Sequence, residues 1–261
     1  MITPLNKNKY SQITIFVIVA IAIIALITIF FIIKKPSVSS GLPPPGEDPR
    51  RYIEVCTELA LQDILPQLEL QGGFSNPTSY HTYNGTKITF LCTAQSKEQL
   101  CINKHPMLNK EIEKEIYNLI KPKIDYCFVN LKNAMKEYNY QEDNMVLNIT
   151  IVDRKLNVDI AKRISFTRNS QTQTIEDFRL SLNSYLSDFV TLSNRIINEE
   201  LTCNCPSESC NADIINLNNQ NRLFEITKPV LTGEGIEVYS IYEPNTKEKF
   251  YFAIKNCVLT I

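Results

Sequence analysis

The sequence predicts an α+β protein: an N-terminal transmembrane helix, then an external domain of helices packed on antiparallel β-hairpins and braced by disulfides. Three observations predict this class. One block of 21 residues near the N-terminus is entirely apolar and uncharged. Beyond it, stretches with helical periodicity and stretches that alternate with a period of two occur in separate blocks, which is typical of α+β folds. Eight cysteines, an even number, all follow the apolar block.

The apolar block comprises residues 13–33, ITIFVIVAIAIIALITIFFII, and follows a short tail of residues 1–12. As a helix the block is about 31 Å long, which is the thickness of the hydrocarbon core of a bilayer. The apolar core of a cleaved signal peptide is shorter, usually roughly 7–15 residues, and ends in small residues. The block therefore predicts an uncleaved helix that crosses a lipid bilayer once.

The charges beside this block discriminate little between the two orientations, because Lys7 and Lys9 precede it while Lys34 and Lys35 follow it. The free amino terminus and the cysteines favour a cytoplasmic N-terminus and a domain outside the cell membrane. Residues 34–51 contain five Pro, two Gly and three Ser. Such a composition predicts a semi-rigid spacer between membrane and domain.

The remainder of the chain is long enough to bury one sizeable core. We expect an α+β domain over residues 52–200 and a cysteine-containing β region over residues 201–261 that packs on the same domain. The formal net charge of −1 gives no basic surface for nucleic acid, so a nucleic-acid partner is not expected. The 44% of hydrophobic residues excludes a chain that is disordered throughout.

Three segments have helical periodicity. The first is residues 52–65, and Pro66 is expected to end or kink it. The second is residues 109–138, where Pro122 predicts a kink or a break into two helices. The third is residues 184–200. The apolar positions that recur on one face of these segments are Ile53, Cys56, Ala60, Ile64, Ile112, Ile116, Leu119, Ile120, Ile124, Cys127, Phe128, Leu131, Met135, Tyr185, Phe189, Leu192 and Ile196.

Other segments alternate between apolar and polar residues. Residues 145–160 do so on both sides of Asp153-Arg154-Lys155, which predicts a hairpin with one buried face. Further strands are predicted at residues 87–92, 163–168 paired with 173–180, and 237–242 paired with 249–258.

Four segments resemble a family of single-span, membrane-anchored surface proteins of small-genome archaea. They are Ser11-Gln12-Ile13-Thr14-Ile15-Phe16, Tyr52-Ile53-Glu54-x-Cys56 leading to Leu70-Gln71-Gly72-Gly73-Phe74, Ile124-Asp125-Tyr126-Cys127 with the hairpin after it, and Tyr251-Phe252-Ala253-Ile254-Lys255-Asn256. The resemblance covers most of the chain and implies a membrane-anchored outer domain with no established activity. Pro66 departs from the family pattern. The start of the apolar block also resembles type IV pilin-like signals, although the first acidic residue here is Glu47.

The cysteines predict disulfides in an oxidising compartment. Cys56 and Cys127 each lie on the apolar face of a predicted helix, so both face the core and are expected to bond; two buried free thiols are the alternative. Cys92 and Cys101 flank a polar stretch and are expected to close a local loop. For the remaining four we expect Cys205–Cys210 with Cys203–Cys257, or an exchange of those partners.

Zinc is the competing interpretation of the cysteines, because Cys101-x3-His105 has ligand-like spacing and His81 and Cys92 lie upstream. The sulfur-rich cluster of Cys203, Cys205 and Cys210 is the second place considered for it. No paired CxxC halves occur, so we predict no metal site and no cofactor. Asn84-Gly85-Thr86 and Asn148-Ile149-Thr150 are N-glycosylation sequons, and Asn148 lies on the strand face opposite the apolar residues.

No phosphate-binding loop, dinucleotide fingerprint, zinc-protease motif or nucleophile elbow occurs in the sequence. We therefore predict a non-enzymatic, single-pass cell-surface protein with a structural or interaction role, whose partners are the bilayer through residues 13–33 and either another protein or further copies of itself. Two alternatives are a pilin-like filament subunit, which requires cleavage near Ser11, and an anchored hydrolase of envelope polymers, which requires converging carboxylates in a cleft.

Overall fold

The computed structural model describes residues 23, 42–202, 214–220, 223–231 and 235–257. Except for Ile23, the predicted span of residues 13–33 lies outside this part of the chain. None of the helices in the described part has the length and apolar content needed to cross a membrane. From Pro43 onward the chain forms one compact unit of mixed α and β structure.

The first described helix, α2 (Pro49–Leu70), begins inside the predicted spacer of residues 34–51. Its start follows from local chemistry, because the Asp48 carboxylate accepts a hydrogen bond of 3.0 Å from the backbone N–H of Arg51. Pro49 occupies the first turn, where its missing N–H has no partner to lose. The spacer is therefore shorter at its C-terminal end than its composition predicts.

Both internal prolines lie within continuous helices, so an end at Pro66 and a break at Pro122 are wrong, whereas a kink at either proline stays a prediction. Pro66 lies inside α2, and Pro122 lies inside α3 (Leu108–Ala134), which is one helix. Both proline rings are exposed, as are Gln62 and Asn118 four residues earlier. The carbonyl that each proline leaves without an N–H therefore faces water, which lowers the cost of keeping the proline inside the helix.

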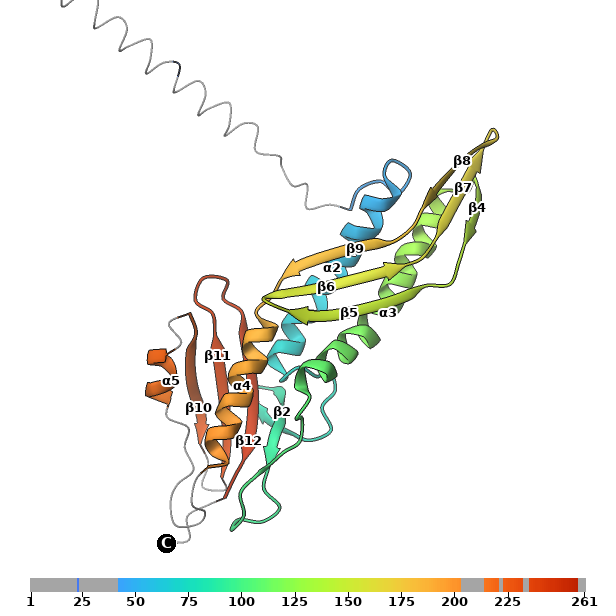
Figure 1. The fold of residues 1–261 in the computed structure, drawn as a ribbon. Helices are drawn as coiled ribbons and strands as arrows, with labels where there is room; N and C mark the ends of the chain where they lie inside the picture. Colours follow the sequence, from blue (N-terminus) through green and yellow to red (C-terminus); the bar gives the residue numbers. More distant parts are fainter. Residues whose placement is uncertain (1–22, 24–41, 203–213, 221–222, 232–234, 258–261) are drawn as a thin grey trace, which may run out of the picture. The chain divides into compact units, whose positions relative to one another are not determined.

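Helices α2 and α3 run antiparallel beside one another (Figure 1). Their apolar stripes form much of the main core, where Ile53, Leu61, Ile116 and Ile120 are fully buried. The predicted hairpin is present as β5 (Val146–Val152) and β6 (Lys155–Ala161), with its turn at Asp153 and Arg154 in the left-handed region. A third strand, β9 (Phe178–Asn183), pairs with β6 and completes a sheet in the order β5-β6-β9.

A second small sheet extends this half of the domain. Its strands are β4 (Asn139–Glu142), β7 (Ile164–Arg168) and β8 (Gln171–Ile175), in the order β4-β7-β8. The predicted strand of residues 173–180 is wrong as one element. Asp177 adopts a left-handed conformation (φ 51°), so the chain leaves β8 after Ile175 and joins the other sheet at Phe178.

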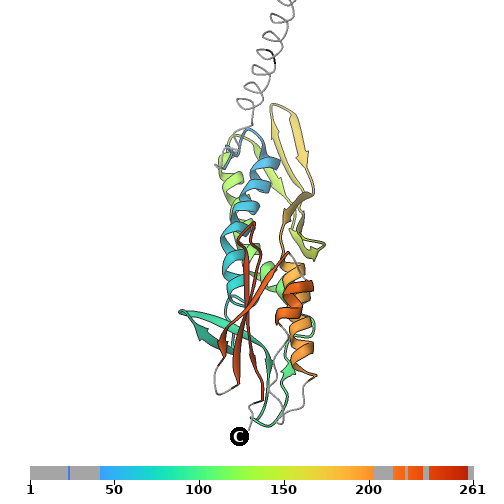
Figure 2. The same ribbon diagram turned by 90° about the vertical axis from the view of Figure 1, so that its left-hand side faces the viewer.

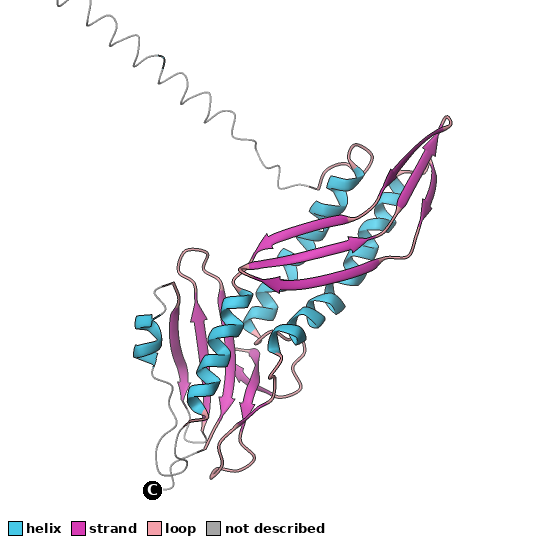
Figure 3. Ribbon diagram, in the orientation of Figure 1, coloured by secondary structure: helices cyan, strands magenta, loops and turns pink. Residues whose placement is uncertain are grey.

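The other half is a larger sheet (Figure 3). Its order is β1-β2-β12-β11-β10, and β3 also pairs with β2; among the described strands of this sheet, the β12–β2 pairing alone is parallel. Helix α4 (Leu186–Glu200) lies against it, and α5 (Ile214–Gln220) lies by β10 (Figure 2). The strands are β1 (Tyr80–Tyr83), β2 (Thr86–Thr93), β3 (Ile102–Asn103), β10 (Glu225–Leu231), β11 (Ile236–Tyr242) and β12 (Lys249–Lys255).

Candidate functional site

Five of the eight cysteines lie within the described residues, and all five are disulfide-bonded. Cys56 bonds to Cys127 and ties α2 to α3, while Cys92 bonds to Cys101 and ties β2 to β3. These are the two pairings expected from the sequence. Cys257 is also disulfide-bonded. Cys203, Cys205 and Cys210 lie outside the described residues.

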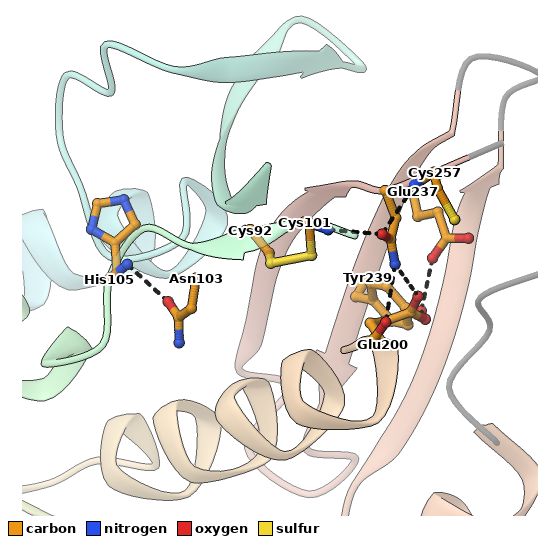
Figure 4. Close-up of a disulfide and its surroundings, with 9 residues drawn as sticks. Cys92, Cys101, Asn103, His105, Glu200, Glu237, Tyr239 and Cys257 are labelled. Carbon is orange, nitrogen blue, oxygen red and sulfur yellow. Dashed lines mark hydrogen bonds between the residues drawn. A yellow bond between two sulfur atoms is a disulfide. The ribbon is translucent and has the colours of Figure 1, made fainter. Parts of the chain in front are cut away.

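A buried polar cluster lies where α4 ends against the large sheet (Figure 4). Glu200 is the last residue of α4, and Glu237 and Tyr239 lie on the buried face of β11. The Tyr239 hydroxyl donates to Glu200 Oε1 and contacts Glu237 Oε2 at 2.9 Å. Lys228 Nζ lies 2.7 Å from Glu237 Oε2 and 3.7 Å from Glu200 Oε1.

Lys228 reaches this cluster because β10 is irregular. The β10–β11 register shifts between Thr227 and Val230, so Lys228 and Pro229 form a bulge opposite Tyr239. Pro229 has no N–H to offer to a ladder and is tolerated at such a bulge. The ammonium group of Lys228 lies 4.8 Å from the centroid of the Tyr239 ring, so it contacts both the ring and the carboxylates.

Among the described residues, the cluster brings together the carboxyl groups of Glu200 and Glu237, the ammonium group of Lys228 and the hydroxyl of Tyr239. Burial, and secondly the charge of Glu200, raise the pKa of the Glu237 carboxyl, against the opposing effect of Lys228. Burial and the two carboxylates also raise the pKa of Tyr239, which keeps its hydroxyl protonated.

Asn256 connects the cluster to the disulfide region. Its Nδ2 donates to Glu200 Oε2 (3.1 Å) and to the Glu200 carbonyl (3.2 Å). Its Oδ1 accepts from the backbone N–H groups of Cys101 and Cys257, each at 3.0 Å. The end of α4, the end of β12 and the Cys92–Cys101 loop are thus held by one buried side chain.

This cluster is closed to a large substrate. Glu200 is fully buried and Glu237 is 4% exposed. A hollow of about 260 Å³ beside Asn256 is lined by that residue, Lys255 and the loop from Ala94 to Lys97, and its lining includes neither carboxylate. The contacts support a structural brace, because acid–base work on a polymer requires carboxylates within reach of the scissile bond.

The sequence contains signals for this cluster that the prediction missed. Glu200 lies four residues after Ile196 and so continues the apolar stripe of α4. Glu237 shares the strand face of Tyr239 and Ile241. A charged residue at a core position of a helix or strand predicts a buried partner.

Another buried carboxyl belongs to Glu69 near the end of α2, which is 6% exposed. Burial, followed by the charge of Glu248, raises its pKa to about 8. Glu248 itself lies in the turn region after β11, where it accepts from the backbone N–H of Tyr185 at 3.4 Å.

The zinc site considered at Cys92, Cys101 and His105 is contradicted, because the sulfur atoms of Cys92 and Cys101 are bonded to each other. His105 Nδ1 lies 2.6 Å from Glu111 Oε2, and its ring lies 4.7 Å from that of Phe74. Throughout the described ranges, no three His, Cys, Asp or Glu side chains are grouped for a metal.

Both sequon asparagines are exposed. Asn84 (φ 49°) and Gly85 (φ 80°) form the two-residue turn between β1 and β2. Asn148 lies on the outer face of β5 between the buried Leu147 and Ile149. An oligosaccharide on either side chain would extend into solvent.

An open hollow of about 610 Å³ lies on one face of the small β4-β7-β8 sheet, near the tip that reaches beyond α3 (Figure 1). Tyr138 and Phe166 meet edge to face there, with ring centroids 6.1 Å apart. Arg168 lies over Tyr138 and pairs with Glu137 at 3.0 Å. Gln171 and Gln173 add amide groups, so the hollow offers both hydrogen bonds and apolar contact.

Comparison of the chain with protein families, with curated proteins and with solved structures found no match.

Proposed function

We propose that the protein is a single-pass, membrane-anchored cell-surface protein with a structural or interaction role, whose N-terminus is cytoplasmic and whose domain lies outside. The observation that carries this proposal is that Cys56, Cys92, Cys101, Cys127 and Cys257 are all disulfide-bonded. Disulfides persist in oxidising compartments and are rare in the cytosol.

The apolar block of residues 13–33 supports the anchor part of the proposal, because its length matches the hydrocarbon core of a bilayer. The spacer places the domain away from the membrane surface. The resemblance to single-span surface proteins of small-genome archaea points to the same arrangement. The open hollow near the tip of the small sheet, lined by aromatic rings, amide groups and Arg168, supports binding as the role of the domain.

The first experiment counts thiols in the full-length protein. Native membranes are dissolved in denaturant with excess maleimide, and the intact mass is measured before and after reduction. We expect no adduct before reduction and eight after it, because the chain has eight cysteines. The variant Cys56→Ala, which leaves Cys127 unpaired, should gain one adduct and so shows that the reagent reaches a core thiol. Adducts on the unreduced native protein would contradict the proposal.

The second experiment tests the side of the membrane. Protease added to intact cells should remove the domain. In inside-out membrane vesicles the domain faces the lumen, so it should be protected until detergent is added. The reverse pattern would place the domain in the cytoplasm. Release of the protein by alkaline washing would contradict the anchor, and a mature N-terminus at Gln12 would support the pilin-like alternative instead.

A further inference from the structure

Strand β8 has one free edge. The two-residue turn at Asn169 and Ser170, both with positive φ, sets the β7–β8 register so that Arg168 pairs with Gln171. Hydrogen-bonded and non-hydrogen-bonded pairs alternate along an antiparallel ladder. Gln171, Gln173 and Ile175 therefore direct their backbone groups to β7, whereas the N–H and C=O groups of Thr172 and Thr174 point away from it.

This edge carries none of the usual features that block pairing. Residues Gln171 to Thr174 are all exposed and uncharged, the strand has no proline, and its register with β7 is unbroken. Two other edge strands do carry such features: β10 has Pro229 and a bulge, and β4 has Glu142. Proteins generally cover or charge an unpaired edge, so an open one favours strand addition.

We propose that β8 pairs with β8 of a second copy of this chain, antiparallel and centred on Gln173. In this register Thr172 of one copy lies opposite Thr174 of the other, and the free groups of both residues form four backbone hydrogen bonds across a two-fold axis. Gln173 of one copy lies opposite Gln173 of the other. The two three-stranded sheets then form one sheet of six strands. The inference deepens the proposed surface role by naming the partner.

The charges beside β8 suit this arrangement. Arg168 lies at the tip end of the strand, whereas Glu176 and Asp177 follow its other end. Arg168 also pairs with Glu137, and Glu176 with Arg163 at 3.1 Å. Antiparallel pairing brings Arg168 of each copy toward the end of β8 in the other copy that Asp177 follows. No like charges face each other within the strand, and the Gln–Gln and Thr–Thr pairs that it creates are favourable cross-strand neighbours.

An interface of five residues per copy is smaller than that of stable protein complexes, so we expect weak association in dilute solution. Anchoring both copies in one membrane raises their effective concentration and favours the pair. The pairing should therefore be measured on the full chain in a bilayer.

The experiment uses charge at the two-fold axis. Full-length protein labelled at its N-terminus with donor or acceptor dye is reconstituted into phospholipid vesicles, and energy transfer is measured against protein density. Gln173→Lys alone or Gln173→Glu alone places like charges opposite one another, and we expect transfer to fall at least threefold toward the random-proximity level. A mixture of the two variants should restore it, because opposite charges then meet.

Gln141 is an exposed position on β4 at the other edge of the same sheet, so Gln141→Lys and Gln141→Glu are the matched controls. They should leave transfer at the wild-type level. Random-level transfer in the wild-type protein, equal transfer for all the Gln173 combinations, or equal losses at Gln141 would each overturn the pairing. The thiol and protease results do not depend on this outcome, so failure here leaves the proposed location standing.

Discussion

Removing the Cys56–Cys127 disulfide should destabilise the domain more than removing Cys92–Cys101. The first bond joins residues separated by 71 positions and the second joins residues separated by 9. If a disulfide stabilises the folded state by lowering the conformational entropy of the unfolded chain, these separations correspond to stabilisations of about 4.4 and about 2.6 kcal/mol at 25 °C. The expected difference between the two double-alanine variants is therefore about 1.8 kcal/mol.

The assay is urea unfolding of the full-length protein in detergent, followed by circular dichroism, because the chain has no tryptophan. Each pair is replaced by alanine so that no free thiol remains, and wild-type protein is measured with and without reductant. The reduced wild type should be the least stable form. Equal losses for the two variants, or a larger loss for the Cys92–Cys101 pair, would refute the loop-length reasoning.

Three further outcomes are expected from the same urea assay. Tyr239→Phe leaves two buried carboxyls without their shared hydroxyl and should cost about 2–3 kcal/mol; Tyr242→Phe, on the same strand, should cost little. Glu69 has a folded pKa of about 8, above its unfolded value, so its contribution is complete below about pH 4.5 and is lost as pH rises toward 8, with a slope approaching about 1.4 kcal/mol per pH unit; Glu69→Gln should flatten this slope, and an unchanged slope would contradict the assignment. Gly73→Ala should cost about 2–4 kcal/mol, because φ is 94° and the new Cβ would lie 2.5 Å from Ile112, whereas Gly85→Ala meets no atom within 4 Å and should cost about 1 kcal/mol.

Periodicity predicted the helices and the central hairpin because each buries one face. The apolar stripe from Ile112 to Leu131 and the alternation around Leu147 and Val158 consist of residues that the fold buries. Their spacing along the sequence therefore indicates the buried face directly. The same stripes placed Cys56 and Cys127 in the core. The disulfide between them therefore followed from local patterns, although their separation is large.

The errors arose where tertiary surroundings override a local rule. Pro66 and Pro122 do not end their helices, because the carbonyls that they free face solvent. Residues 173–180 divide between two sheets at Asp177, since a left-handed residue redirects the chain without a glycine or proline to signal it. The parallel pairing of β12 with β2 joins segments far apart in sequence, and no short-range pattern predicts such a partner.

The buried cluster was missed for a related reason. Glu200, Glu237 and Lys228 are ordinary charged residues until the fold brings them together. Only their positions on apolar faces distinguish them, and Lys228 further depends on the bulge at Pro229.

The position of the Cys56–Cys127 bond also has a mechanical consequence. If the proposed anchor holds the chain at a membrane, a pull on the domain would enter α2 at Pro49 and reach the bond within two turns of that helix. From there the covalent link transfers the load to α3. The chain between the two cysteines then cannot lengthen, which withholds about 240 Å of extended contour while the bond is intact. Reduction would release that length, so the redox state sets how far a tethered molecule stretches before it breaks.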